Sequence, residues 1–159
     1  MKAFMDKEFM LQSPTAQHLY HDYAADMPIC DYHCHIPPRE IYENRRFENI
    51  AQVWLGGRNP DGSYFGDHYK WRVMRSNGVP EEYITGDKPD RERFQKFAEA
   101  LPMAIGNPMY HWTNLELHVF FGYDGVLNGD TAEEVWNLCN DKLQHDPKLT
   151  VRGLIEQSN

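Results

Sequence analysis

The sequence predicts a mainly α-helical chain that contains one short β-strand. Helix-capping residues stand before most of its amphipathic segments, which is the pattern that starts helices. Only one run, Ile29–His33, has the alternation and the bounding prolines expected of a strand. The 11 glycines and 10 prolines among 159 residues favour short elements separated by turns. We therefore expect a helix, one strand and then roughly six or seven helices.

The first helix is expected to begin at Ser13, whose hydroxyl can cap it while Pro14 occupies the first turn. Pro28 ends this segment, and the strand follows. Side chains alternate along a strand, so its residues divide between two faces. Ile29, Asp31, His33 and His35 are expected on one face, and Cys30, Tyr32 and Cys34 on the other.

After the prolines at positions 37 and 38 the chain is expected to be helical or looped. Asn49 can cap a helix over Ile50–Leu55, and Asp67 can cap a helix over His68–Ser76, each followed by glycine. Between them, Arg58–Gly66 has the turn residues of an exposed loop. The remaining predicted elements are a turn at Pro80–Ile84, helices over Arg91–Leu101 and Asn107–Phe121, a capping box at Asp130–Glu133 before a buried stripe of Val135, Leu138, Cys139 and Leu143, and a last helix capped by Thr150.

A single strand does not make a sheet, because its backbone donors and acceptors need neighbouring strands. The strand must therefore pair with a partner chain or be the first part of a larger domain. We favour the second interpretation.

The composition disfavours several classes of partner. The net charge is −8 and there is no tract of lysine and arginine, which argues against binding to nucleic acid or anionic membranes. No window approaches the ~20 apolar residues of a membrane span, and the amino terminus lacks the apolar stretch of a signal peptide. Cys30, Cys34 and Cys139 lack a zinc-knuckle spacing and are expected to be free thiols. We therefore expect a soluble, cytoplasmic protein.

His33 and His35 are the most informative residues of the sequence. They are two positions apart at the end of the predicted strand, so both imidazoles should project to one side. Neutral imidazole is a common ligand of zinc and related metals, and a catalytic metal site needs further ligands and an open position. From spacing alone, metal binding and an incidental pair of histidines have about even odds. Asp31 faces the same way and can either orient a ligand or hydrogen-bond to a turn.

Three motifs, in order, resemble one known family. Asp31–Ile36 reads Asp-Tyr-His-Cys-His-Ile, Gly66–Arg75 reads Gly-Asp-His-Tyr-Lys-Trp-Arg-Val-Met-Arg, and Tyr110–Leu117 reads Tyr-His-Trp-Thr-Asn-Leu-Glu-Leu. With Asn77-Gly78, these runs are similar to uronate isomerase (glucuronate isomerase), a branch of the amidohydrolase superfamily, and the similarity extends from Phe4 to Asn159. The resemblance implies a metal-dependent (β/α)8 barrel with a helical insertion after the first strand. Residues 1–36 would then be the amino-terminal helix and first barrel strand, and residues 37–159 the helical insertion domain.

The resemblance also implies a reaction and its residues. The reaction interconverts D-glucuronate with D-fructuronate, and D-galacturonate with D-tagaturonate, in a protein expected to be a homo-oligomer. His33 and His35 match the family's metal pair, which implies a divalent metal, with zinc expected, in a site that is incomplete in this chain. His68 and Tyr69 match a His-Tyr pair that contacts the uronate sugar and takes part in catalysis. Arg58–Phe65 is longer than usual for the family.

The residues alone give a plainer interpretation of His68 and Tyr69, as surface residues of a first helical turn. Neighbouring residues on a helix differ by about 100° in direction, so both reach one ligand only at the helix start. Asp67 as the cap puts them there, with helix amides that also favour an anion such as a carboxylate. An aldose–ketose isomerisation needs a base, an acid and stabilisation of an enediolate, which such groups and a metal can supply.

Two other hypotheses remain open. The His-x-His spacing is shared across the amidohydrolase superfamily, so the protein could be a metal-dependent hydrolase of that superfamily. The single unpaired strand and the missing ligands are also consistent with a non-catalytic helical interaction module. In either case we expect the 159-residue chain alone to be catalytically inactive, and to self-associate through its exposed strand.

Overall fold

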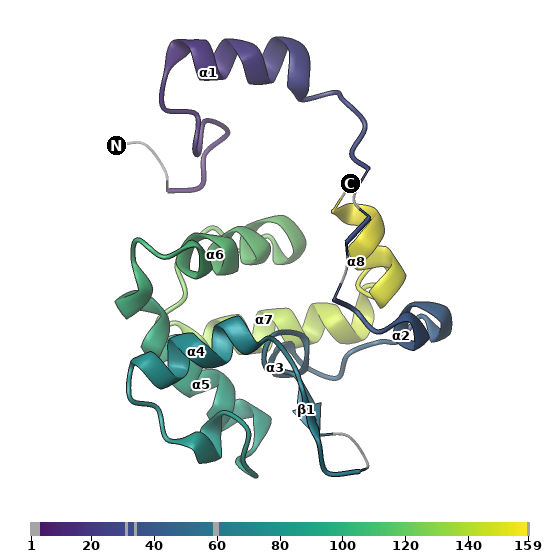
Figure 1. Ribbon diagram of the computed structural model, residues 1–159, viewed down its shortest axis with the longest axis vertical. Helices are drawn as coiled ribbons and strands as arrows, with labels where there is room; N and C mark the ends of the chain where they lie inside the picture. Colours follow the sequence, from purple (N-terminus) through teal and green to yellow (C-terminus); the bar gives the residue numbers. More distant parts are fainter. Residues whose placement is uncertain (1–3, 31, 34, 59–60, 159) are drawn as a thin grey trace.

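The computed structural model describes residues 4–30, 32, 33, 35–58 and 61–158. An amino-terminal arm, residues 4–30, 32 and 33, stands apart from a body of packed helices formed by residues 35–58 and 61–158 (Figure 1). The arm carries helix α1, Pro14–Leu19, which continues into a π-helical turn, η1, at Tyr20–Ala24. Ser13 caps α1 as predicted, because its Oγ accepts a hydrogen bond from the amide of Ala16 at 3.1 Å.

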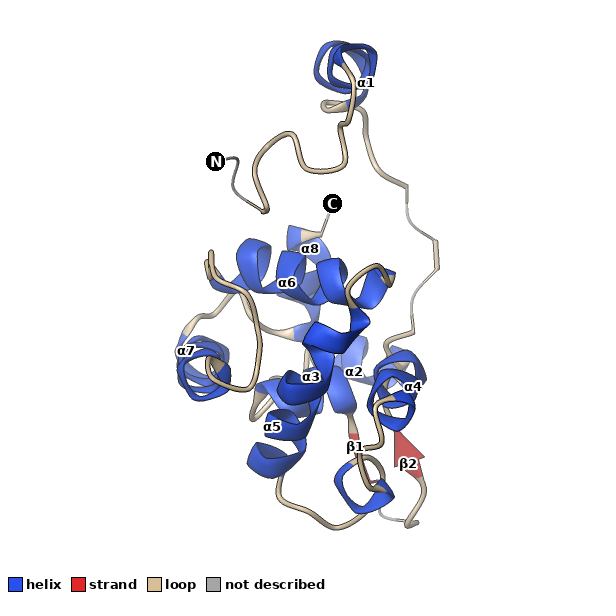
Figure 2. Cartoon of the chain, turned by 90° about the vertical axis from the view of Figure 1, so that its left-hand side faces the viewer, coloured by secondary structure: helices blue, strands red, loops and turns tan. Residues whose placement is uncertain are grey.

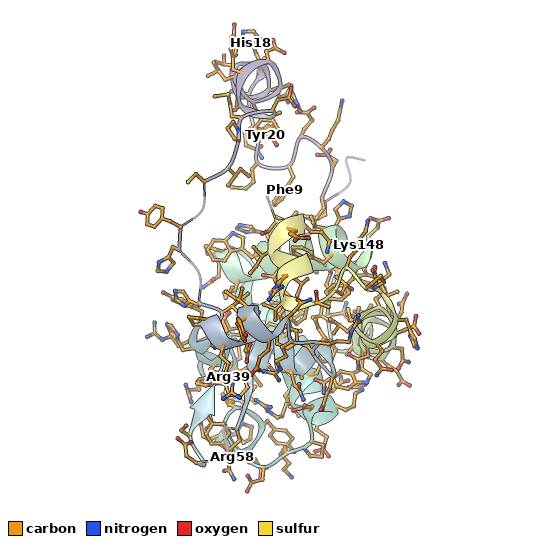
Figure 3. The ribbon with its side chains drawn as sticks, turned by 90° about the vertical axis from the view of Figure 1, so that its right-hand side faces the viewer. Phe9, His18, Tyr20, Arg39, Arg58 and Lys148 are labelled. Carbon is orange, nitrogen blue, oxygen red and sulfur yellow. The ribbon has the colours of Figure 1, made fainter. Side chains whose placement is uncertain are left out.

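The arm touches the body through two aromatic contacts near its start. The ring of Phe4 lies 5.7 Å from the ring of Tyr110, and the ring of Phe9 lies 5.8 Å from that of His111. Figure 3 shows Phe9 where the arm meets the body, whereas His18 lies at the far tip. The chain then returns from α1 to the body along an extended path (Figures 1 and 2).

The strand predicted at Ile29–His33 is wrong for this chain. Those of its residues that the structure describes form no strand pairing, and the side chain of Tyr32 is 96% exposed. An extended segment becomes a strand only when another strand satisfies its backbone donors and acceptors. Among the described residues none lies alongside this segment to do so. Asp31 and Cys34 lie outside the described residues.

A two-stranded sheet forms in and next to Arg58–Gly66, the segment predicted to be an exposed loop. Strand β1, Gly57–Arg58, pairs antiparallel with β2, Tyr64–Phe65, with Gly57 opposite Phe65 and Arg58 opposite Tyr64. Strands of two residues are too short to show the alternation from which a strand is predicted. The hairpin projects from the body beside α4 (Figure 2).

The body is helical, as predicted. Its α-helices and 3₁₀ turns are α2 (Pro38–Glu43), α3 (Ile50–Leu55), α4 (His68–Ser76), η2 (Glu81–Tyr83), α5 (Asp90–Ala100), η3 (Leu101–Ala104), α6 (Pro108–Phe121), α7 (Ala132–His145) and α8 (Val151–Gln157). The helix α5 lies at the centre and packs against α3, α4 and α7. Its Phe94 and Phe97 are fully buried, and the indole of Trp54 stacks on the ring of Phe94 with 6.1 Å between centroids. None of the helices in the described part of the chain is long and apolar enough to cross a bilayer.

Most of the predicted caps are confirmed. Asn49, Asp67, Asn107 and Thr150 each accept a hydrogen bond from a backbone amide in the first turn of the helix that follows. The predicted capping box at Asp130–Glu133 is wrong, because Thr131 stands at the cap of α7 without making a side-chain capping bond. Its Oγ1 instead donates to the carbonyl of Val126 and accepts from the amide of Asn128, both at 2.9 Å.

Contacts between distant parts of the chain fix α2 beside α8. Arg152 Nε donates to the carbonyl oxygen of Ile41 at 2.8 Å, and Arg46 forms an isolated β-bridge with Thr150. Arg46 also donates to the carbonyl of Leu143 at 2.6 Å. These bonds hold α2 against the body, which matters because α2 forms one wall of the cavity described next.

Candidate active site

His33 and His35 lie together, as the sequence predicted. Their Nε2 atoms are 2.8 Å apart and their ring centroids 4.8 Å apart. Both side chains are exposed. Residues two apart project to the same side of extended backbone whether or not that backbone is paired into a sheet. The contact therefore survives although the predicted strand does not form.

This pair has the geometry for two ligands of one metal ion. In a tetrahedral site, two nitrogens that each bind a zinc ion at ~2.0–2.1 Å lie about 3.3 Å apart, so the two imidazoles would have to separate slightly to share one ion. Their 2.8 Å separation also suits a hydrogen bond in which one neutral imidazole donates to the other. A catalytic zinc site takes three protein ligands, and no group of three or more His, Cys, Asp or Glu side chains suited to a metal occurs among the described residues. Among the described residues, the pair could therefore supply two ligands of such a site and no third.

His68 and Tyr69 are the first two residues of α4, as predicted. Both are exposed, and their ring centroids lie 4.3 Å apart with 33° between the ring planes. Asp67 caps the helix: its Oδ1 accepts from the amide of Tyr69 at 2.8 Å and from that of Lys70 at 3.4 Å. The helix start therefore presents an imidazole and a phenol side by side to solvent.

The charge of Asp67 is stabilised locally. Partial burial would raise the pKa of this carboxyl, but the Lys70 ammonium and the two amide hydrogen bonds outweigh that effect and lower it. The amides of Tyr69 and Lys70 that an anion would meet at this helix end are thus already bonded to Asp67. The sequence led us to expect that the amides at this helix start could bind an anion. Two of those amides are instead occupied by Asp67.

One cavity of about 380 Å³ connects these residues. His35, His68 and Tyr69 all line it. Its volume lies within the range of small-molecule sites, roughly 300–1,000 Å³. Because His33 contacts His35, all four side chains predicted to be functional lie in or directly beside this cavity.

The rest of the wall was not foreseen from the sequence. Glu40 of α2, Gln52 of α3 and Phe65 of β2 also line the cavity. Arg45 joins the two polar residues, donating to Glu40 at 2.5 Å and to Gln52 at 3.2 Å, and its guanidinium lies 5.8 Å from the Phe65 ring centroid. Single polar residues on six-residue helices carry no motif, so no sequence signal identified them.

Imidazole, phenol and carboxylate side chains around one small cavity are typical of enzyme sites that bind small polar molecules. The particular family follows from comparison with known proteins. A family model described as glucuronate isomerase matches residues 1–159, and the chain belongs to that family.

Known relatives agree with this assignment. Over its whole length the chain is 70% identical to a uronate isomerase of Lachnospira eligens and 58% identical to one of Lachnoclostridium phytofermentans. It covers 32% of each of those proteins and corresponds to their amino-terminal portion. The chain therefore spans about a third of the length of these relatives. Because both are uronate isomerases, they do not favour the hydrolase hypothesis.

Solved structures lead to the same family. The crystal structure of uronate isomerase from Thermotoga maritima matches with a TM-score of 0.82 and 34% identity, over 98% of this chain and 32% of that one. Glucuronate isomerase from Caulobacter crescentus matches with a TM-score of 0.75 over 92% of this chain and 30% of that one, and at 24% identity it supports the fold alone.

Proposed function

We propose that this chain forms part of the active site of a uronate isomerase. The reaction is an aldose–ketose isomerisation that interconverts D-glucuronate with D-fructuronate, and D-galacturonate with D-tagaturonate. The observation that carries the proposal is the cavity lined jointly by His35, His68 and Tyr69, although the first two are 33 residues apart in sequence. Membership of the glucuronate isomerase family supports the choice of substrate.

Each of the four residues has a role in this proposal. His33 and His35 hold a divalent metal, with zinc as the first expectation, because their Nε2 atoms lie close to the spacing of two ligands. The bound metal supplies a Lewis acid for sugar oxygens. His68 and Tyr69 contact the sugar and transfer protons at its oxygens, since an imidazole and a phenol can each accept and donate a proton. Phe65 contributes an apolar wall that limits water.

We also propose the architecture in which this site is completed. Residues 1–36 supply the amino-terminal helix and the first strand of a (β/α)8 barrel of the amidohydrolase superfamily, and residues 37–159 are the insertion that follows it. The extended segment with both imidazoles on one side, and the prolines that end it, support this arrangement. The two-ligand metal site implies that the 159-residue chain alone is inactive.

The test compares the complete gene product with the 159-residue chain. Each is supplied with zinc or manganese and assayed for conversion of D-glucuronate to D-fructuronate, and metal content is measured by mass spectrometry. We expect turnover only in the complete protein. No turnover by the complete protein with either metal would refute the function, and turnover by the chain alone would refute the architecture.

Variants of the complete protein separate the roles. The double substitution H33A/H35A should abolish both bound metal and activity. Replacing Tyr69 with Phe should lower activity at least about tenfold while metal content is unchanged, because general acid–base groups typically contribute 10²–10⁴-fold. Replacing His145, an exposed histidine of α7 that is outside the cavity, with Ala is the matched control and should leave both unchanged. Full metal content in H33A/H35A would remove these residues from the metal site.

We further propose that the protein is a cytoplasmic homo-oligomer. The exposed free thiol of Cys30 suits a reducing compartment. The arm exposes apolar side chains, among them Tyr23, Met27 and Ile29, which favours association. Light scattering tests this: a clean monomer of the complete protein at high concentration would refute the oligomer, and a monomeric 159-residue chain would refute self-association through the arm.

A further inference from the structure

Lys70 is a buried lysine directly behind the candidate catalytic pair. It is the third residue of α4 and only 4% exposed, whereas its neighbours His68 and Tyr69 face solvent. A buried ammonium is stable only when it has charged or hydrogen-bonding partners. Its Nζ lies 3.0 Å from Oδ2 of Asp67, the residue that caps the same helix.

The two oxygens of Asp67 have separate partners. Oδ1 accepts from the amides of the first turn, and Oδ2 accepts from the Lys70 ammonium. A carboxylate bonded on both oxygens has one orientation, whereas a carboxylate bonded on Oδ1 alone can turn toward solvent. Lys70 therefore fixes the side chain on which the start of α4 depends.

Side chains on two other helices, α3 and α6, interact with Lys70. Its Nζ lies 5.8 Å from the ring of Trp54 on α3, within range of a cation–π attraction. The charge of Lys70 also acts on the half-buried carboxyl of Glu116 on α6: burial raises the pKa of Glu116, while Lys70 and a hydrogen bond from the Trp54 side chain oppose that change. Lys70 thus bonds to the cap of α4, contacts Trp54 of α3 and acts electrostatically on Glu116 of α6.

We propose that Lys70 is a positioning residue of the active site: it holds Asp67 in its capping orientation and so directs His68 and Tyr69 into the cavity. The inference rests on the proposed function, because it assigns Lys70 to the chemistry of those two side chains. Small displacements of catalytic groups reduce rates strongly, so the loss of Lys70 should affect turnover more than folding.

The first test measures uronate kinetics in the complete gene product. K70M removes the charge and keeps most of the length, K70R keeps the charge, and K96M is the control on α5, where Lys96 is paired with Glu99 at the surface. At a temperature at which all variants are folded, we expect K70M to lower kcat/KM about tenfold or more, K70R to recover part of the loss, and K96M to match the wild type. A K70M value within twofold of the wild type overturns the proposal.

A double-variant comparison distinguishes positioning from general stabilisation. If Lys70 acts through Asp67, K70M/D67A should lose no more activity than D67A alone. If the losses multiply, Lys70 acts by another route and the proposal is wrong. Should K70M fail to fold, K70R and D67A still give the comparison, because K70R should have no further effect once Asp67 is absent.

The second test does not depend on activity. In the 159-residue chain, NMR should show the Tyr69 amide exchanging at least about tenfold faster in K70M, with shifted ring signals of His68 and unchanged amides in α7. If the wild-type complete protein lacks isomerase activity but this result holds, the proposed function fails and the positioning role stands. If the Tyr69 and His68 signals match the wild type, the positioning role fails whatever the activity.

Discussion

Arg93 of α5 donates a hydrogen bond to the backbone carbonyl oxygen of Leu55, at 3.3 Å, across 38 residues of sequence. The same guanidinium donates to the carbonyls of Gly56 at 3.1 Å and Ile84 at 3.0 Å, and Arg93 is only 4% exposed. The last carbonyls of a helix have no partner within it. Together with Trp71, whose Nε1 donates to the carbonyl of Leu55 at 3.0 Å, Arg93 therefore satisfies the end of α3 from outside, where the chain turns into the hairpin that lines the cavity.

We expect R93M to destabilise the chain by about 3–5 kcal/mol, because it leaves three buried carbonyls and the carboxylate of Asp90 without their cationic donor. Urea unfolding monitored by circular dichroism measures this. R91M is the matched control on the same helix: Arg91 is half-buried and donates to Gln95, so the loss should be under about 1 kcal/mol. Equal losses in both variants would contradict the special role of Arg93.

Gly56, between α3 and the hairpin, gives a second prediction about stability. Its φ is +66°, and a Cβ there would lie 1.8 Å from the carbonyl oxygen of Phe65. G56A should therefore displace β2 and lower the free energy of unfolding by about 3 kcal/mol or more. Gly62 has φ +84° with nothing within 4 Å of a Cβ. G62A should therefore lower the free energy of unfolding only by the cost of a left-handed backbone conformation, about 1–2 kcal/mol. Thermal unfolding of the pair checks the difference, and a G56A loss no larger than that of G62A would refute the close approach.

Local signals were sufficient to predict most of the helices. The capping side chains of Asn49, Asp67 and Thr150 act on amides two or three residues away, so each helix start is encoded within a few positions. The strand at Ile29–His33 was wrong because strand formation needs a partner that no local pattern supplies. The capping box predicted at Asp130–Glu133 was wrong because Thr131, not Asp130, stands at the cap, and its hydroxyl bonds to Val126 and Asn128 of the preceding loop.

In the candidate site too, the features set by local geometry were predictable and those set by packing were not. The proximity of His33 to His35, and the placement of His68 and Tyr69 at a helix start, follow from local geometry and were predictable. That His35 and the start of α4 would share a cavity is a consequence of how α2, α3 and the hairpin pack. No pattern within one segment specifies that packing, and Glu40 was therefore missed.

Cys139 should be chemically inert in the folded chain. It is fully buried on α7, and burial raises the pKa of its thiol to about 12, with Lys142 opposing the change. Thiolate is the reactive form, so iodoacetamide near pH 8 should label the exposed Cys30 at least about 100-fold faster than Cys139. Peptide mass spectrometry follows both sites. In concentrated urea the two rates should converge, and equal rates without urea would contradict the burial of Cys139.

The carboxyl of Glu116 should make the folded state more stable as the pH falls. Burial raises its pKa above the ordinary value of 4.5, so the folded state binds this proton more readily than the unfolded state. Its contribution is therefore unfavourable at neutral pH, is relieved as the pH falls through the raised pKa, and is fully relieved below about 4.5. In urea unfolding across this range, the wild type should gain stability relative to E116Q.

Glu99 is the control of opposite sign, because a hydrogen bond from Lys96 lowers its pKa. Its stabilising contribution is therefore present above about 4.5 and is lost as the pH falls through the lowered pKa. The wild type should accordingly lose stability relative to E99Q at low pH, and the same sign in both comparisons would contradict the raised pKa of Glu116.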